Sequence, residues 1–414
     1  MKNILRSSPK ADAECLLSQI SPEARLLLCC ARTCISPETA GQIKRLVREG
    51  IDWVSLIRMA IPHGVLPLLY WGLNSTCPES VPEATLGQFK RQFHINASRN
   101  NFLAGELIKL LRLLNDEGIA AIPWKGPELA ASVYRNLALR QFYDLDILVQ
   151  ERNVTKAKDL LLGLGFRPKT ELTNSQEQMQ LQSYYVYEFE RESDEKVNVE
   201  LHWSFLEKEF SFPIDIDLLF DRLRTVQVAG AQIPSMRPED LILVLCVHGS
   251  KHHWYRLGWV CDIAELVRSN QVDWRHAMEQ ATTLGVRRML LLGLFLSKAL
   301  LDAALPDSVC RALRDDAAVR SLAAGVIARL FQESGDSQKE LDAYAFNLKM
   351  RERLSDRVVY SIHLARNQSP AVRWRLPLPA FLSLLYYLLR PSWLIGKYEA
   401  NLLKSFRESF KHPA

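Results

Sequence analysis

The sequence predicts an α+β fold in which a small mixed sheet with flanking helices lies between two helical regions. Residues 1–115 and 236–414 carry apolar residues at helical spacing, whereas strand and helix patterns alternate through residues 116–235. At 414 residues the chain is long enough for two or three domains. We therefore expect an N-terminal helical region (1–115), a central α+β domain (116–235) and a C-terminal helical domain (236–414).

The composition is that of a soluble globular protein with a mild positive charge. Apolar residues make up 48% of the chain and charged residues 24%, and the formal net charge is +5. This excess permits an anionic ligand. The chain has no strong basic run, so its composition disfavours nucleic acid as a partner.

The cysteines and the N-terminal residues favour a cytoplasmic location. The eight cysteines lack CxxC spacing, and Cys29 and Cys30 lie in an apolar helical run. This usage argues for a reducing environment and against a disulfide or zinc framework. Residues 1–19 contain no apolar stretch of the kind that a secretory signal requires.

The N-terminal region is predicted to form successive helices. His63-Gly64 interrupts the pattern, and a lone histidine at such a boundary is typical of a cap or a packed ring, with reach into a functional site as the alternative. The expected helices cover residues 23–31, 39–49, 53–60, 65–73 and 96–115.

Residues 123–149, PWKGPELAASVYRNLALRQFYDLDILV, carry the strongest functional pattern. A short strand over residues 120–124 ends at Lys125-Gly126, and a helix with proline in its first turn follows over residues 127–134. Gly126 allows a backbone turn to approach a ligand closely, and the free N–H groups at the start of the helix favour an anion.

The next strand, residues 144–149, begins with two aspartates. Because side chains alternate faces along a strand, Asp144 and Asp146 emerge on one face while Leu145 and Ile147 point to the other. Two neighbouring carboxylates repel each other and are costly unless a divalent cation lies between or beside them. The pattern therefore predicts a strand that binds metal.

A third carboxylate, needed if two metal ions are to be held, follows in the alternating segment 197–203. Asn198, Glu200 and His202 share one face of this expected strand. Residues 184–189 are the expected hairpin partner. If the hairpin lies beside the aspartate strand, Glu200 faces the two aspartates.

Two further motifs in the central domain are structural by their context. The helix expected over residues 153–164 stops at a Gly-Leu-Gly sequence that lacks the surroundings of a dinucleotide-binding loop. A second Asp-x-Asp occurs at residues 215–217, but helical spacing follows it and no glycine turn precedes it. We expect it to begin a helix, where aspartates suit the helix dipole.

A helix also opens the C-terminal domain. If it runs through Trp254, His248, Lys251 and His252 occupy one face, and these side chains suit the oxygens of a triphosphate. A zinc-like His-x-x-x-His site, which here lacks the HExxH glutamate, and a purely structural face are the alternatives. We expect Trp254 and Trp259 in the core, with nucleobase stacking as the alternative.

Residues 377–389, PLPAFLSLLYYLL, are strongly apolar between basic flanks. They are too short to cross a bilayer, so we expect no transmembrane segment. A buried terminal helix is the expected structure, with peripheral membrane contact as the alternative.

These motifs resemble the nucleotidyltransferases of the DNA polymerase beta superfamily, and within it a broad bacterial family whose members mostly lack assigned substrates. The likeness covers most of the chain up to about Leu266. At Gly126-Pro127 the superfamily usually has Gly-Ser or Gly-Gly, so a serine contact to phosphate is missing here, as in the closer family. The likeness is carried by Ala60–Tyr70, Lys125-Gly126, Arg140, residues 144–149, residues 199–203 and residues 248–254.

The resemblance implies a polymerase beta-like core in residues 116–235 and an enzyme that moves an NMP, expected to be AMP, from an NTP co-substrate. The acceptor would be a hydroxyl or similar group of a small molecule, peptide or protein, and pyrophosphate would be released. Asp144, Asp146 and Glu200 would be catalytic and bind two Mg²⁺ ions, with Mn²⁺ as the alternative metal. The nucleotide-binding residues would be Lys125, Gly126, Arg140, His248, Lys251 and His252.

Several alternatives remain open. Glu200 would also accept the proton of the acceptor hydroxyl. Arg140 could brace the aspartates instead of contacting phosphate. A non-catalytic nucleotide sensor would bind nucleotide without releasing pyrophosphate, although all three carboxylates are present. A transferase acting on RNA ends would bind with a steep salt dependence.

Overall fold

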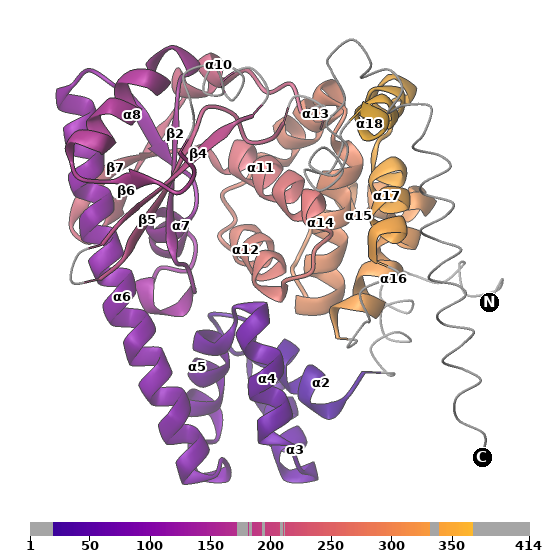
Figure 1. Cartoon of the computed structure of the whole chain (residues 1–414). Helices are drawn as coiled ribbons and strands as arrows, with labels where there is room; N and C mark the ends of the chain where they lie inside the picture. Colours follow the sequence, from indigo (N-terminus) through magenta and orange to yellow (C-terminus); the bar gives the residue numbers. More distant parts are fainter. Residues whose placement is uncertain are drawn as a thin grey trace, which may run out of the picture. The chain divides into compact units, whose positions relative to one another are not determined.

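The computed structural model describes residues 20–171, 181, 184–192, 195–207, 210, 212–331 and 339–366. The chain divides into two compact units, Met1–Glu352 and Arg353–Ala414. Within the second unit the structure describes one helix, α18 (Leu354–Arg366). All described strands belong to the first unit, shown with its helices in Figure 1.

A five-stranded mixed sheet lies at the centre of the first unit. Its order is β1-β2-β5-β4-β3, in which β2 and β5 are parallel and the other neighbours are antiparallel. This arrangement confirms the predicted α+β class and the predicted hairpin. The strands are β1 (Ala121–Pro123), β2 (Asp144–Val149), β3 (Arg167–Pro168), β4 (Val186–Arg191) and β5 (Val197–His202).

One face of the sheet is apolar, as the alternating sequence predicts. Leu145 and Ile147 of β2 and Val199 and Leu201 of β5 are buried in one hydrophobic cluster. The same cluster contains residues of α6 (Glu83–Asp116), whose C-terminal part lies beside the sheet in Figure 1, and of α8 (Val154–Gly163). A second, two-stranded sheet pairs β6 (Arg224–Val228) with β7 (Ala231–Ser235).

The N-terminal helices confirm the predicted succession. Ser21, Ser36 and Asp52 accept hydrogen bonds from backbone N–H groups at the starts of their helices, as N-caps do. Helix α6 begins well before the predicted Asn96, and Phe89 in its added part is buried in the core. The shorter helices are α2 (Pro22–Cys30), α3 (Pro37–Glu49), α4 (Trp53–His63) and α5 (Leu66–Thr76).

The C-terminal part of the first unit consists of helices and their connecting turns in its described residues. Helix α14 is buried along most of its length and packs against α11, α12, α13 and α16. The N-terminal helices share this hydrophobic cluster. The helices are α11 (Pro238–Lys251), α12 (Leu257–Arg268), α13 (Trp274–Leu284), α14 (Arg287–Leu301), α15 (Asp307–Asp315), α16 (Ala317–Leu330) and α17 (Lys339–Met350).

Helix α11 ends before Trp254, so the longer helix considered from the sequence does not form. The helix ends at Lys251, and His253 and Trp254 adopt left-handed backbone angles with φ of 54° and 55°. This turn directs the Trp254 ring into the core, where it is fully buried. The predicted core position of Trp254 is therefore confirmed, and the alternative of nucleobase stacking by this ring is wrong.

Within the described residues, no helix combines the length and the apolar character that a bilayer crossing requires. The apolar segment 377–389 lies outside the described residues. All described cysteines are free thiols.

Replacing Gly249 by alanine tests the packing of the Trp254 ring. A Cβ at this position would lie 2.6 Å from a ring carbon of Trp254, so we expect Gly249→Ala to cost about 1–3 kcal/mol. Gly41→Ala is the matched control. It is also helical, nothing lies within 4 Å of its added Cβ, and it should stabilise by up to about 1 kcal/mol. Urea unfolding followed by circular dichroism measures both, and equal stability of the two variants would contradict this account.

Candidate active site

Two carboxylates lie opposite each other on the polar face of the sheet. In the parallel register of β2 and β5, Asp146 is paired with Glu200 and Asp144 with Asn198. Because the pairing fixes the faces, the same register that buries Leu145 and Val199 places Asp146 and Glu200 together. The predicted meeting of Glu200 with the aspartate strand is therefore confirmed.

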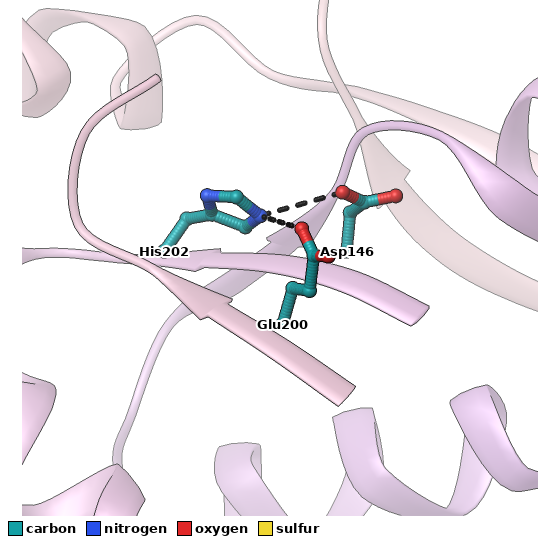
Figure 2. A group of neighbouring side chains, drawn as sticks. All are labelled: Asp146, Glu200 and His202. Atoms are coloured by element: carbon teal, nitrogen blue, oxygen red, sulfur yellow. Dashed lines mark ion pairs between the residues drawn. The ribbon is translucent and has the colours of Figure 1, made fainter. Parts of the chain in front are cut away.

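His202 completes a three-residue group with these acids, shown in Figure 2. Its Nε2 lies 3.3 Å from Asp146 Oδ1 and 3.2 Å from Glu200 Oε2. Burial opposes the charged imidazole, but the two carboxylates raise the pKa of His202 above its ordinary value. Ligand atoms of all three side chains lie within 4.8 Å of one another.

Lys125 and Gly126 lie at the turn between β1 and α7 (Gly126–Ser132). Lys125 Nζ is 3.0 Å from Asp146 Oδ1 and 3.8 Å from the centre of the Trp124 ring. Burial opposes the charge of Asp146, but Lys125 and His202 hold the pKa of its carboxyl well below the ordinary value. Gly126 has φ of 55°, and a Cβ there would meet the Asp144 carbonyl oxygen at 3.3 Å, so the turn requires glycine.

Asp144 lies beside the group of three but outside it. Burial, followed by the charges of Asp146 and Glu200, raises the pKa of its carboxyl from 3.8 to about 6. Repulsion between the acids is thus concentrated on Asp144, because Asp146 is the one neutralised by Lys125. The opposite shifts of two carboxyls on one strand are typical of a functional site.

Arg140 joins the sheet to helix α12. Its guanidinium donates two hydrogen bonds to Asp262, of 2.9 Å to Oδ1 and 3.0 Å to Oδ2, and the Tyr134 hydroxyl donates a third of 2.7 Å to Oδ1. Asn100 on α6 donates to the backbone carbonyl of Arg140. The segment that leads into Asp144 is therefore held from both sides.

The predicted basic face of α11 borders the same site. Burial lowers the pKa of His248 well below its ordinary value, and burial with the Lys251 charge lowers the pKa of His252 to about 4. Both histidines are therefore neutral at pH 7. Lys251 Nζ lies 2.5 Å from the Tyr185 hydroxyl and 3.2 Å from Glu207 Oε1.

These side chains line one pocket with a volume of about 400 Å³. All nine residues predicted for the site belong to its wall or, for Gly126, to the turn beside it. Their individual roles in catalysis and nucleotide binding remain predictions. The wall also contains residues that had no predicted role: Tyr134, Tyr185, Tyr255 and Asp262.

Two other sequence motifs have clear structural contacts. His63 is buried, and its Nδ1 accepts the backbone N–H of Leu257 at 3.3 Å, which agrees with a packed ring, and His63 also belongs to the wall of the pocket, which agrees with the alternative of reach into the site. Asp215 caps the short helix α10 (Ile216–Phe220), as predicted, by accepting the Leu218 N–H. The second Asp-x-Asp therefore lies on a helix start and not on a strand.

The donor set suits a divalent cation. Asp144, Asp146 and Glu200 supply oxygen atoms on one face, and His202 supplies a nitrogen. Neither ring nitrogen of His202 makes a well-directed hydrogen bond within the described part of the chain, although Nε2 is close to both carboxylates. Buried polar atoms in this condition are rare in folded proteins and fit a metal-binding role.

Removing Asp262 tests the clamp on Arg140. The Arg140 and Asp262 side chains are only 10% and 4% exposed, so Asp262→Ala leaves a buried guanidinium unpaired, and we expect a loss of about 3–5 kcal/mol. Arg152→Ala, which breaks an ion pair whose side chains are each 64% exposed, should cost less than about 1 kcal/mol. A small effect of Asp262→Ala in chemical denaturation would refute the clamp.

The raised pKa of Asp144 predicts a stability change with pH. The folded protein binds this proton more tightly than the unfolded chain, so ionising Asp144 lowers stability as pH rises from 3.8 through about 6. Without metal, Asp144→Asn should be more stable than the parent protein at pH 8, by on the order of 1 kcal/mol, and the gain should vanish near pH 4. Melting temperatures across this range measure it, and a gain independent of pH would count against the repulsion.

The comparison with protein families agrees with this geometry. The family described as uncharacterised nucleotidyltransferases matches residues 49–302, which is more than half of the chain and includes the whole sheet, α11 and α12. Searches of curated proteins and of solved structures found no match. With its paired carboxylates on β2 and β5, the chain belongs to the family of uncharacterised nucleotidyltransferases.

Proposed function

We propose that this nucleotidyltransferase uses Mg²⁺ to move an NMP, expected to be AMP, from an NTP to a hydroxyl or similar group of a small molecule, peptide or protein. The observation that carries the proposal is the pairing of Asp146 with Glu200 on parallel strands, with Asp144 beside them. Free thiols at the described cysteines support the cytoplasmic location expected from the sequence.

Asp144, Asp146 and Glu200 would hold the metal ions. When bound, these ions would offset the charge of the triphosphate and of the leaving pyrophosphate. The acceptor oxygen would form a bond to the α-phosphorus as the bond between this phosphorus and the β-phosphate oxygen breaks. Glu200, whose side chain is 29% exposed toward the pocket, would take the proton that the acceptor loses.

The positively charged side chains near the pocket would have different roles in nucleotide binding. Lys125 contacts only one oxygen of Asp146, so it would turn toward the β- and γ-phosphates once a metal ion neutralises that carboxylate. Arg140 is engaged by two hydrogen bonds with Asp262, which supports the bracing alternative over direct phosphate contact. The neutral His248 and His252 would donate single N–H groups.

The pocket supports a compact acceptor. Its volume of about 400 Å³ lies in the range of small-molecule sites. The His248 ring packs at 5.7 Å from Trp124 and 5.3 Å from Trp259, and Tyr255 packs at 4.6 Å from Trp259. This wall suits a nucleobase, a small molecule or one peptide side chain better than an RNA helix.

The test supplies each α-labelled NTP with Mg²⁺ and a cell extract. We expect label to pass to an acceptor, with release of pyrophosphate and with ATP as the best donor. Nucleotide binding without pyrophosphate release would favour the non-catalytic sensor. Loss of affinity by orders of magnitude between low and moderate salt would instead favour an RNA acceptor.

Asp146→Asn and Glu200→Gln test the assignment of the paired carboxylates. Each removes a charge that would hold metal, an effect of several kcal/mol, so we expect transfer to fall by about 10²–10⁴-fold. Asp217→Asn is the matched control because it alters the second Asp-x-Asp at a side chain that is 64% exposed and pairs with Arg152. Activity retained in folded Asp146→Asn protein would refute the assignment, and melting curves establish that the variants fold.

A further inference from the structure

His202 lies close to two carboxylates without a well-directed hydrogen bond to either of them. Its side chain is 3% exposed, and edge-on contacts with Trp124 at 5.5 Å and tilted contacts with Tyr185 at 5.9 Å fix its ring. Nε2 faces the two carboxylates in Figure 2, yet the direction of the ring N–H satisfies neither of them. A histidine serving only as their hydrogen-bond donor would point at one oxygen.

The distances from His202 to the two carboxylates match the spacing of ligands that share one ion. Metal–ligand bonds of about 2.1 Å, meeting at the angles of octahedral or tetrahedral sites, place neighbouring ligand atoms roughly 3.0–3.4 Å apart. The distances from His202 Nε2 to Asp146 Oδ1 and Glu200 Oε2 are 3.3 and 3.2 Å. Nε2 is therefore as close to each oxygen as one ligand is to the next around a single ion.

A nitrogen donor changes which ion is preferred. Mg²⁺ takes oxygen ligands and retains its waters, whereas imidazole nitrogen suits first-row transition ions, of which Mn²⁺ also accepts carboxylates readily. We propose that His202 is a direct metal ligand and that the ion held by Asp146, Glu200 and His202 is a first-row transition ion such as Mn²⁺ in preference to Mg²⁺. This rests on the proposed function for the premise that the site holds a cation.

The rival arrangement is a charged His202 that acts as a counter-ion in place of metal. Lys125 already neutralises Asp146 on one side, so a second fixed cation would leave little attraction for a divalent ion. The two arrangements predict opposite results when His202 is removed. Loss of a ligand weakens metal binding, whereas loss of a competing cation strengthens it.

The experiment uses the full chain, stripped of metal and titrated with Mn²⁺, with Mg²⁺ as competitor. Electron spin-echo spectroscopy detects a nitrogen nucleus bonded to Mn²⁺, and ¹⁵N-histidine labelling assigns that nitrogen to a histidine. We expect a histidine coupling in the parent protein and its loss in His202→Gln. Mn²⁺ affinity should fall by at least about 10–100-fold in this variant, and Mg²⁺ affinity should fall less.

His248→Gln is the matched control, since His248 is buried in the wall of the same pocket but lies outside the group of three. This variant should keep the coupling and the Mn²⁺ affinity. Bound Mn²⁺ without a histidine coupling, a coupling that persists in folded His202→Gln, or tighter binding in that variant would each overturn the inference. In these cases NMP transfer with Mg²⁺ still stands, whereas a histidine coupling in a protein that transfers no NMP would overturn the proposed function alone.

Discussion

The active-site region depends on one pairing, in which Asp146 lies opposite Glu200 across two parallel strands. A slip of β2 by one residue against β5 would separate the carboxylates, and it would also turn Leu145 and Ile147 out of the hydrophobic cluster. Burial of the apolar face therefore enforces an electrostatically unfavourable arrangement on the polar face. The sheet supplies the rigidity that a metal site requires, because its strands cannot move apart without exposing their core.

The repulsion that this register creates is offset unevenly. Lys125 lies on the β1–α7 turn and His202 lies on β5, and both side chains contact Asp146. Asp144 has no such partner within hydrogen-bonding distance among the described residues, and its carboxyl shows the raised pKa. An arrangement stabilised at one carboxylate and strained at the next is typical of sites kept for function at a cost in stability.

Much of this region follows from local sequence, and the rest depends on distant contacts. Because side chains alternate along a strand, Asp144 and Asp146 share one face of β2, and Glu200 and His202 share one face of β5. The pairing of β2 with β5 then brings these two sets to the same side of the sheet. No local pattern identifies Asp262, which meets Arg140 across 122 positions of sequence. The end of α11 cannot be predicted from local sequence either. The turn at His253 and Trp254 adopts left-handed angles without glycine, and burial of the Trp254 ring stabilises it. The early start of α6 likewise depends on packing.

Every cation predicted to meet phosphate is already paired, and the pairs differ in how readily they can exchange. Arg140 makes two hydrogen bonds to a carboxylate on α12 that is almost fully buried, so its release would leave that charge unpaired at a large cost. Lys125 can leave Asp146 more easily, since it contacts only one oxygen of that carboxylate, and Lys251 is held by Glu207, whose side chain is 31% exposed. Under the proposed function, an incoming triphosphate would therefore compete best for the two lysines, while Arg140 would keep the segment before Asp144 in place. The site thus separates fixed charges, which position the acids, from exchangeable ones, which are available to a ligand.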